Sequence, residues 1–144
     1  MTHTFWCHES ELRVDDHSIM DYPQVLRTAA GIQSTAEDLA HWIIALQRGR
    51  LLKDEQSLTM MWTQLRPQHG ETGAWAWSIG WPVLSRPKHP AYQASGGEMA
   101  ALAIYPRDDL SVVILTNLQG AAPEELLDKV AAFFIPDLTV STAK

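Results

Sequence analysis

The sequence predicts an α+β fold, in which an antiparallel sheet has helices packed on it. Three observations support this class. A capped stretch with helical spacing begins at Ser34, apolar residues alternate from Trp75 onward, and a continuous β-branched run covers Leu110 to Thr116. Because the helical and strand patterns occupy separate parts of the chain, we expect the helices to be segregated from a sheet of at least four antiparallel strands.

Composition is that of one ordinary globular domain. The chain has 144 residues, 46% of them apolar, and a net charge of -6, and a domain of this length buries roughly 70% of its unfolded surface. The acidic balance and the scattered basic residues argue against nucleic acid or an anionic membrane as the main partner. Cys7 is the only cysteine, which excludes an internal disulfide and a cysteine-based metal cluster.

No targeting or membrane segment is expected. No apolar stretch approaches the roughly 20 residues of a membrane span, and the first ten residues lack the apolar core of a signal peptide. The compartment is left open. We expect three parts: a polar, irregular N-terminal segment over residues 1–27, the main folded region over 28–138, and a tail over 139–144.

The first helix is predicted to begin at Ser34, which forms a capping box with Glu37 three residues later. Its apolar stripe consists of Leu39, Ile43 and Leu46. Gly49 is expected to end it.

A second helix is predicted from its cap at Asp54 to about Gln64. Its apolar stripe consists of Leu58, Met61, Trp62 and Leu65. Pro67 and Gly70 are expected to terminate it.

The strand pattern then begins. Residues 75–81 alternate as one strand, and the prolines over 82–90 predict a loop. Two further strands are expected at Tyr92–Glu98 and Ala100–Tyr105, followed by a turn at Pro106–Asp109. Leu110–Thr116 reads as a central strand buried on both faces.

The last helix opens near Pro123, which suits the first helical position, and has two acidic residues in its first turn. Its expected core face consists of Leu126, Leu127, Val130 and Phe134. Pro136 is expected to end it.

One motif and its order in the chain resemble a known family. The segment Ala94-Ser95-Gly96-Gly97-Glu98 is followed by two strands, and the segment Ala30–Leu39 precedes it. Together they resemble the C-terminal half of the superfamily of serine β-lactamases, penicillin-binding proteins and related esterases. The resemblance covers about residues 28–138, and Met1–Phe5 is similar to the segment that follows the family's helical domain, which would make Met1 an internal methionine of a longer parent.

The resemblance implies acyl transfer through a covalent serine ester. Three elements would be needed: S-x-x-K, then Y-x-N or S-x-N, then K-T-G or H-x-G on a strand that lines the cleft. The literal S-x-x-K matches are Ser85 to Lys88, in a proline-rich loop, and Ser141 to Lys144, at the chain end. We expect neither to act as nucleophile and base. Asn117 is the only asparagine and follows no suitable Tyr or Ser, so the second element is absent from this chain.

The third element is present in altered form. Ser95 and Gly96 match the family's pattern, whereas Ala94 stands where the family has Lys or His. The resemblance implies that Ser95 binds substrate and that the Gly97 N–H donates to the oxyanion. The alternative is that the two glycines only mark a bulge or close packing.

The function expected from the resemblance is that of a fragment of a β-lactamase-related serine hydrolase. It would act on a small-molecule ester or amide, use no cofactor and contain no metal, and be inactive alone because the nucleophile half is missing. Members of this family are often periplasmic or secreted. The alternative is a non-catalytic ligand-binding or self-associating module, because unpaired strands and apolar patches recruit partners.

Other candidate residues support weaker hypotheses. A metal site formed by His3, Cys7, His8 and Glu9 lacks an established ligand spacing. The aromatic residues Trp42, Trp62, Trp75, Trp77 and Trp81 are expected in the core or cleft wall rather than in a sugar-stacking surface. His41 is expected to be a partly exposed helix residue, and His69 and His89 have no acidic or serine partner nearby in sequence.

Overall fold

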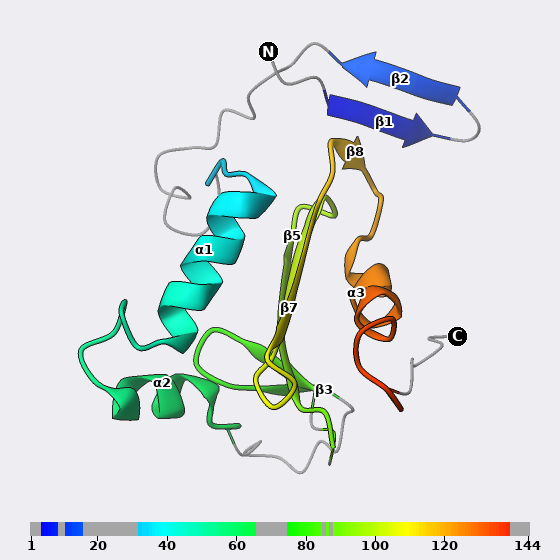
Figure 1. Cartoon of the computed structure of the whole chain (residues 1–144). Coiled ribbons are helices and arrows are strands. Elements are labelled where there is room, and N and C mark those ends of the chain that lie inside the picture. Colours follow the sequence, from blue (N-terminus) through cyan, green and yellow to red (C-terminus); the bar gives the residue numbers. More distant parts are fainter. Residues whose placement is uncertain are drawn as a thin grey trace.

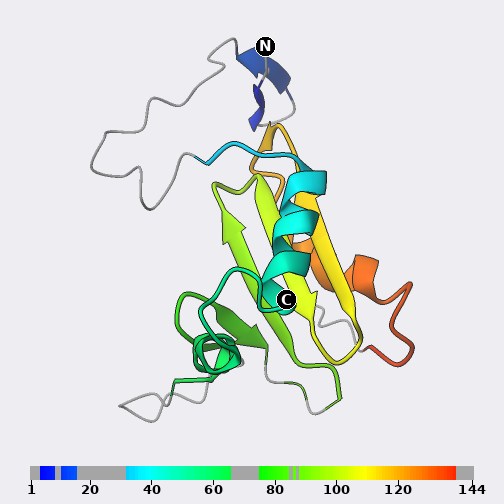
Figure 2. The same cartoon turned by 60° about the vertical axis from the view of Figure 1, so that its left-hand side comes forward.

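A five-stranded antiparallel sheet lies between helices on both faces (Figures 1 and 2). The computed structural model describes residues 4–8, 11–15, 32–65, 75–84, 86 and 88–138. In order across the sheet, its strands are β3 (Trp75–Trp77), β4 (Pro82–Leu84), β5 (Ala91–Gly96), β6 (Ala100–Tyr105) and β7 (Leu110–Leu115). The helices α1 (Ala36–Gln47) and α2 (Glu55–Trp62) cover one face, and α3 (Glu124–Ala131) covers the other. The predicted α+β class is confirmed.

A second, smaller sheet corrects the prediction that the N-terminal segment is irregular. It joins β1 (Thr4–His8), β2 (Glu11–Asp15) and β8 (Leu118–Gln119). The strands β1 and β2 form an antiparallel pair, and β8 pairs with β1 in parallel. The sequence signal was the alternation of Leu12 and Val14 with charged residues, the period of a strand.

The first helix begins one residue later than predicted. Thr35, not Ser34, is its N-cap: the Thr35 hydroxyl accepts a hydrogen bond from the Asp38 N–H at 3.1 Å, and the Ser34 hydroxyl donates to the Thr35 carbonyl. The Ser34–Glu37 capping box is therefore wrong. Both hydroxyls suit a cap, and the backbone at Thr35, which is extended while Ala36 is already helical, decides between them.

The prediction that Gly49 ends the first helix is confirmed. Gly49 has a φ of +67°, its N–H donates to the Leu46 carbonyl, and the Arg50 N–H donates to the Ala45 carbonyl. This pair of hydrogen bonds is the Schellman motif, which favours glycine at the left-handed position.

The second helix begins as predicted. The Asp54 carboxylate accepts hydrogen bonds from both the N–H and the hydroxyl of Ser57, each at 2.7 Å, and these bonds hold the pKa of Asp54 below its usual value. The helix ends at Trp62, two residues before the expected end, and Leu65 is exposed. Pro67 and Gly70, the expected terminators, lie outside the described residues.

The predicted single strand over residues 75–81 is a hairpin. The chain turns after Trp77, where the N–H and hydroxyl of Ser78 both donate to the Trp81 carbonyl and Gly80 has a φ of +81°. Pro82, expected in a loop, then pairs with Trp77 as the first residue of β4. A proline is tolerated there because the first residue of a strand can lack a ladder donor.

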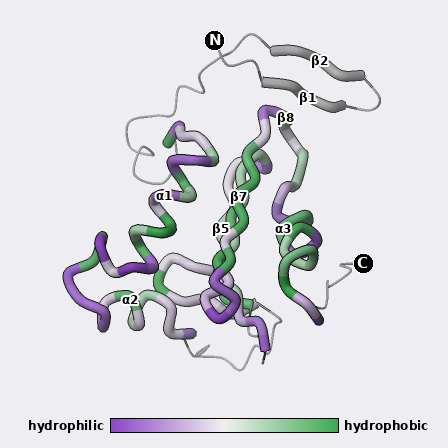
Figure 3. The backbone as a smooth tube through the Cα atoms, viewed as in Figure 1, coloured by the Kyte–Doolittle hydropathy of each residue, from purple (hydrophilic) through white to green (hydrophobic). Residues whose placement is uncertain are grey.

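The strand β7 lies at the edge of the sheet, not at its centre as predicted. Its apolar run has a different cause. Val112 and Ile114 pack on the α3 side and Val113 packs on the α1 side, so both faces are covered although one edge is open among the described residues. Figure 3 shows this continuous apolar character along β7.

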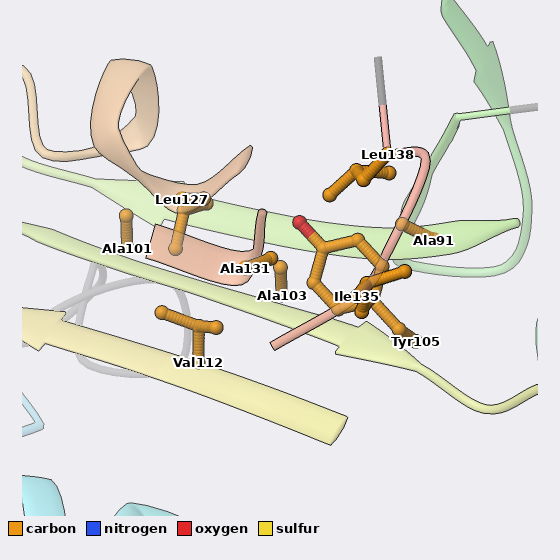
Figure 4. Packing of buried hydrophobic residues seen from close by; sticks show 9 residues of the cluster. All are labelled: Ala91, Ala101, Ala103, Tyr105, Val112, Leu127, Ala131, Ile135 and Leu138. Atoms are coloured by element: carbon orange, nitrogen blue, oxygen red, sulfur yellow. The ribbon is translucent and has the colours of Figure 1, made fainter. Parts of the chain in front are cut away.

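Two apolar clusters hold the layers together. The cluster between α1, α2 and the sheet is built on Ile43, Leu46, Trp81 and Ile104. Within it Trp62 stacks on Tyr92, and the more exposed Trp42 stacks on Trp81 from outside, with ring centroids 4.7 and 6.3 Å apart. The cluster under α3 (Figure 4) consists of Ala91, Ala101, Ala103, Tyr105, Val112, Leu127, Ala131, Ile135 and Leu138.

The core face of α3 is rotated from the predicted one. Leu127 is completely buried, Val130 is partly buried against the cluster, and Leu126 and Phe134 are 44% and 68% exposed. The observed buried series, 127, 131, 135 and 138, keeps helical spacing but starts one residue later than Leu126. The helix ends at Ala131, before Pro136, and turns complete the chain to Leu138.

A polar network also fastens α3 to the sheet. Asp128 accepts two hydrogen bonds from the Arg86 guanidinium and one from the Tyr105 hydroxyl, the last at 2.7 Å. Burial, followed by the Asp128 hydrogen bond, raises the pKa of Tyr105 far above its usual value, against the lowering effect of Arg86. Since each group has a partner, the half-buried charges are compensated.

Candidate active-site strand

The predicted cleft motif lies on a part of β5 that has only one neighbouring strand. Pairing of β4 with β5 is limited to Val83 with Tyr92 and Leu84 with Ala91, whereas β6 pairs with β5 up to Gly96. Within the part of the chain that the structure describes, the last residues of β5 therefore have an open edge. Ser95 and Gly96 are exposed there.

The hydrogen-bond alternation shows which backbone groups face this edge. The Thr116 N–H donates to the Met99 carbonyl, so residues 99, 101 and 103 direct their backbone groups toward β7 and residues 100, 102 and 104 toward β5. Ser95 pairs with Ala101 and Ala94 pairs with Leu102. It follows that the N–H and C=O of Ser95 point away from β6, into the open edge.

The Gly97 N–H points the same way. The Gly96 carbonyl accepts from the Met99 N–H at 3.3 Å and so faces the hairpin. Because a trans peptide directs N–H and C=O oppositely, the Gly97 N–H faces outward. The N–H groups of Ser95 and Gly97 therefore lie along one edge, two residues apart.

Backbone geometry explains why glycine occupies position 97. Gly97 and Glu98 are the central residues of the turn that joins β5 to β6, and both have positive φ, +60° and +55°. Hairpin turns of this kind place both central residues in the left-handed region, which glycine enters without strain. A Cβ at Gly96 would meet nothing within 4 Å, so Gly96 is not required by close packing in the described structure.

A small hollow lies beside the same end of β5, on the α1 side of the sheet. Its volume is about 130 Å³. Its apolar walls are Leu39, Ala94, Ala100, Leu102 and Leu115. Ser95, which also borders it, is the only lining residue with a polar side chain among those described.

The charged residues next to the lining residues in the sequence are acidic. Glu98 follows Gly97 in the turn, and Glu37 and Asp38 occupy the first turn of α1, beside Leu39. None of the described lining residues is basic. The site therefore combines outward backbone donors, one hydroxyl and apolar walls.

This geometry agrees with the comparison against protein families. The family model described as Beta-lactamase matches residues 1–135. The chain belongs to the beta-lactamase family. It is thus a relative of serine hydrolases that act on small molecules. No curated protein and no solved structure matches the chain.

The S-x-x-K motif marks the nucleophile in the beta-lactamase family, and neither of its two literal matches in this chain lies wholly within the described residues. Ser85, Ser141 and Lys144 lie outside the described residues, and Lys88 is exposed. Asn117 is exposed and directly follows Thr116, the residue after β7. Beside the predicted residues Ser95 and Gly96 the structure places Leu102 and also Leu39 and Leu115, and the last two lie far from the motif in sequence.

The aromatic residues divide between core and surface. Trp81 is buried and Trp62 partly buried, whereas Trp77 is 60% exposed and Trp42 42% exposed. The side chain of Trp75 lies outside the described residues. The two stacks pack Trp42 and Trp62 against neighbouring aromatic rings, so those two faces contact protein.

One histidine interacts with a residue that is distant in the sequence, which is why the interaction was not predicted. His89, expected to have no partner nearby in sequence, lies 2.9 Å from the Asp108 carboxylate through its Nδ1 atom. His41 is exposed on α1 as expected, and His69 lies outside the described residues. The His89–Asp108 pair joins the β4–β5 connection to the β6–β7 turn, at the opposite end of β5 from the hollow.

The part of the chain that the structure describes contains neither a metal cluster nor a membrane-spanning helix. No group of three or more His, Cys, Asp or Glu side chains there could hold a metal ion. His3 and Glu9 of the weak metal hypothesis lie outside those residues, as do the side chains of Cys7 and His8. No described helix is long and apolar enough to cross a membrane.

Proposed function

We propose that this chain supplies the substrate-binding strand of a serine hydrolase that cleaves a small ester or amide through an acyl-serine intermediate. The observation that supports the proposal is the pair of outward N–H groups at Ser95 and Gly97, beside an apolar hollow. Gly97 donates to the oxyanion, and Ser95 hydrogen-bonds the substrate. Backbone donors aimed at developing negative charge are a large source of rate enhancement in acyl transfer.

The chain alone is proposed to be inactive. Its sequence offers two literal S-x-x-K matches in poor contexts and no Y-x-N or S-x-N. A serine hydroxyl needs an adjacent base to become a nucleophile. In this proposal the nucleophile and base come from polypeptide other than these 144 residues.

A hydrolysis assay tests the inactive state. The pure chain and its Ser85→Ala/Ser141→Ala double variant are incubated with p-nitrophenyl butyrate and a chromogenic cephalosporin. We expect both proteins to match the buffer rate. Turnover by the chain that is lost in the double variant would identify one of these serines as the nucleophile, and turnover that persists would show a nucleophile elsewhere in the chain.

A second assay tests the proposed strand itself. The coding sequence before Met1 is read for S-x-x-K and Y-x-N, and the extended protein is expressed. Replacing the Gly97 amide by an ester removes its N–H and weakens the Gly96 carbonyl as an acceptor, and we expect kcat to fall by about 10²–10³-fold, as for other oxyanion donors. The same replacement at Gly120, in the loop before α3, serves as the control. An unchanged kcat, or an upstream sequence without the two motifs, would contradict the proposal.

The second candidate function is a self-associating, non-catalytic module. It is favoured by the edge of β7 that has no neighbouring strand among the described residues, and by Phe133 and Phe134, which are 86% and 68% exposed after α3. Exposed strand edges and apolar patches recruit partners. A stable dimer combined with an extended protein that lacks hydrolase activity would select this function over the first.

A further inference from the structure

The strand β7 lacks the features that usually protect a sheet edge. Edge strands tend to be short or to carry a lysine, a proline or a bulge that blocks further pairing. β7 has six residues without a charge or a proline, and its register with β6 is uninterrupted. The strand at the other edge, β3, has only three residues. The helices α1 and α3 lie over the two faces of β7 (Figures 1 and 2), and no described strand pairs with its outer edge.

The backbone groups on this edge are arranged symmetrically about Val113. The Thr116 N–H donates to the Met99 carbonyl, and the strands pair in register from there, so the even-numbered residues of β7 bond to β6. The N–H and C=O groups of Ser111, Val113 and Leu115 therefore point outward. Because Val113 lies midway between the other two, this edge is complementary to a second copy of itself running in the opposite direction.

One register uses all three outward residues. Val113 of one copy lies opposite Val113 of the second copy, and Ser111 lies opposite Leu115. These are hydrogen-bonded pairs, in which the two residues exchange both N–H···O=C bonds. A shift of two residues in either direction would place one outward residue beyond the end of the partner's β7, whose bounds are Leu110–Leu115. The symmetric register therefore makes the most hydrogen bonds within the strands.

The side chains are compatible with this register. Val112 lies opposite Ile114 of the second copy on the α3 side, and Val113 lies opposite itself on the α1 side. Cross-strand pairs of β-branched residues stabilise antiparallel sheets. Just beyond the strand, Asp109 of one copy comes beside Asn117 of the other, so the register places no like charges opposite each other.

We propose that the outer edge of β7 is a homodimer interface, in which two copies of the chain pair β7 with β7 in antiparallel about a two-fold axis at Val113. The same surface is used by both copies, so the assembly closes at two. The inference rests on the second candidate function, the self-associating module, and deepens it by naming the partner, the strand and the register. The open part of β5 lies on the other side of β6 and is not used by this contact.

The register is tested on the unmodified 144-residue chain. Equal amounts of ¹³C-labelled and unlabelled chain are mixed, and isotope-filtered NOE spectra select contacts between copies. Val112 and Ile114 of the second copy form a non-hydrogen-bonded pair, whose Cα atoms lie about 4.5 Å apart. We therefore expect an NOE between the Hα atoms of these two residues. A dimer that lacks this contact would overturn the inference.

A proline variant tests the hydrogen bonds of the edge. Ser111→Pro removes an outward N–H and no bond to β6, and a proline is tolerated where the missing N–H faces away from the sheet. Ser111→Ala is the matched control, because it keeps the N–H and also loses the hydroxyl that lies 3.5 Å from Gln47 Oε1.

Sedimentation equilibrium gives the dimer Kd of both variants. We expect the Kd of Ser111→Pro to be about tenfold higher or more than that of Ser111→Ala, since each copy loses one hydrogen bond. Equal Kd values would overturn the inference. If Ser111→Pro does not fold, the NOE between copies of the unmodified chain decides alone.

The remaining outcomes separate this inference from self-association in general. Association that Ser111→Pro leaves unchanged and Phe133→Ser/Phe134→Ser abolishes would place the contact after α3; it would keep the self-associating module and reject the β7 interface. A monomeric chain would reject both. Slow hydrogen exchange at the Val113 and Leu115 amides of such a monomer would show that another part of the same chain covers the edge.

Discussion

At the scale of single residues, the hydroxyl of Thr35 secures the first turn of α1. It accepts the Asp38 N–H, one of the helix donors that has no partner within the helix. Thr35→Ala removes this acceptor and is expected to lower the free energy of unfolding by about 1 kcal/mol. Urea unfolding of the variant and the parent chain measures the difference.

Ser34→Ala is the matched control, because the Ser34 hydroxyl only donates to the neighbouring Thr35 carbonyl. We expect its urea midpoint to stay close to that of the parent chain. A larger loss from Ser34→Ala than from Thr35→Ala would place the cap at Ser34 and contradict the geometry seen here.

Because the Tyr105 hydroxyl is buried and hydrogen-bonded, we expect the free energy of unfolding to decrease at alkaline pH. Burial and the Asp128 hydrogen bond raise its pKa above the value of about 10 of an unfolded tyrosine. The unfolded chain therefore loses this proton first, so the stabilising contribution is complete below about pH 10 and is lost as the pH rises toward the folded-state pKa. Tyr105→Phe removes this titration and costs about 1 kcal/mol at neutral pH through the lost hydrogen bond.

Urea midpoints measured from neutral to alkaline pH test this expectation. The parent chain should lose stability above about pH 10 more steeply than Tyr105→Phe. Some alkaline loss should remain in the variant, because burial also raises the pKa of Tyr92, against a smaller opposing effect of Arg107. Parallel pH profiles for the two proteins would show that Tyr105 is not the titrating group.

At the scale of elements, the packing energy of α3 depends on which of its leucines faces the sheet. Leu127 is fully buried against the sheet, whereas its neighbour Leu126 is 44% exposed. Leu127→Ala is expected to cost about 2–5 kcal/mol, as for other buried leucines. Leu126→Ala removes the same atoms from a partly exposed site and should cost much less. Similar urea midpoints for the two variants would place the core face where the sequence pattern alone suggested.

Local elements were predictable because their signals are local. The Asp54 cap, the Gly49 terminus and the strands around the 106–109 turn follow from neighbouring residues and are confirmed. The errors concern long-range placement. The apolar run of β7 indicates that both faces of the strand are covered, but it does not indicate how many strands lie beside it. Pro82 is tolerated in a strand only because it is the first residue of β4.

The candidate site shows the same limit. The resemblance made Ser95, Gly96 and Gly97 candidate site residues from one segment of the chain. It did not identify Leu39 or Leu115, which reach the hollow only because α1 and β7 pack beside the end of β5. The His89–Asp108 pair was not predicted either, because the two residues are 19 positions apart and only the fold brings them together.

At the scale of the whole molecule, exposed apolar surface predicts association. Phe133, Phe134 and Ile32 are among the exposed large side chains, and the backbone groups of Ser111, Val113 and Leu115 face the open side of β7. We expect the pure chain to self-associate at low micromolar concentration. Light scattering coupled to size exclusion measures this, and a monodisperse monomer that melts cooperatively would contradict it. Phe133→Ser/Phe134→Ser should reduce association, with Lys53→Ser as a control at an exposed polar position.

The strand order carries a kinetic consequence. Each strand from β3 to β7 pairs with the next one in the chain, so the sheet is a meander whose loops close at small entropic cost. The packing of α1 on β7 joins residues such as Gln47 and Ser111, which are 64 positions apart. Since local contacts form fastest, we expect amides of β5, β6 and β7 to gain protection from hydrogen exchange during refolding before those of α1. The wall that Leu39 contributes to the hollow would then be the last part of the site to assemble.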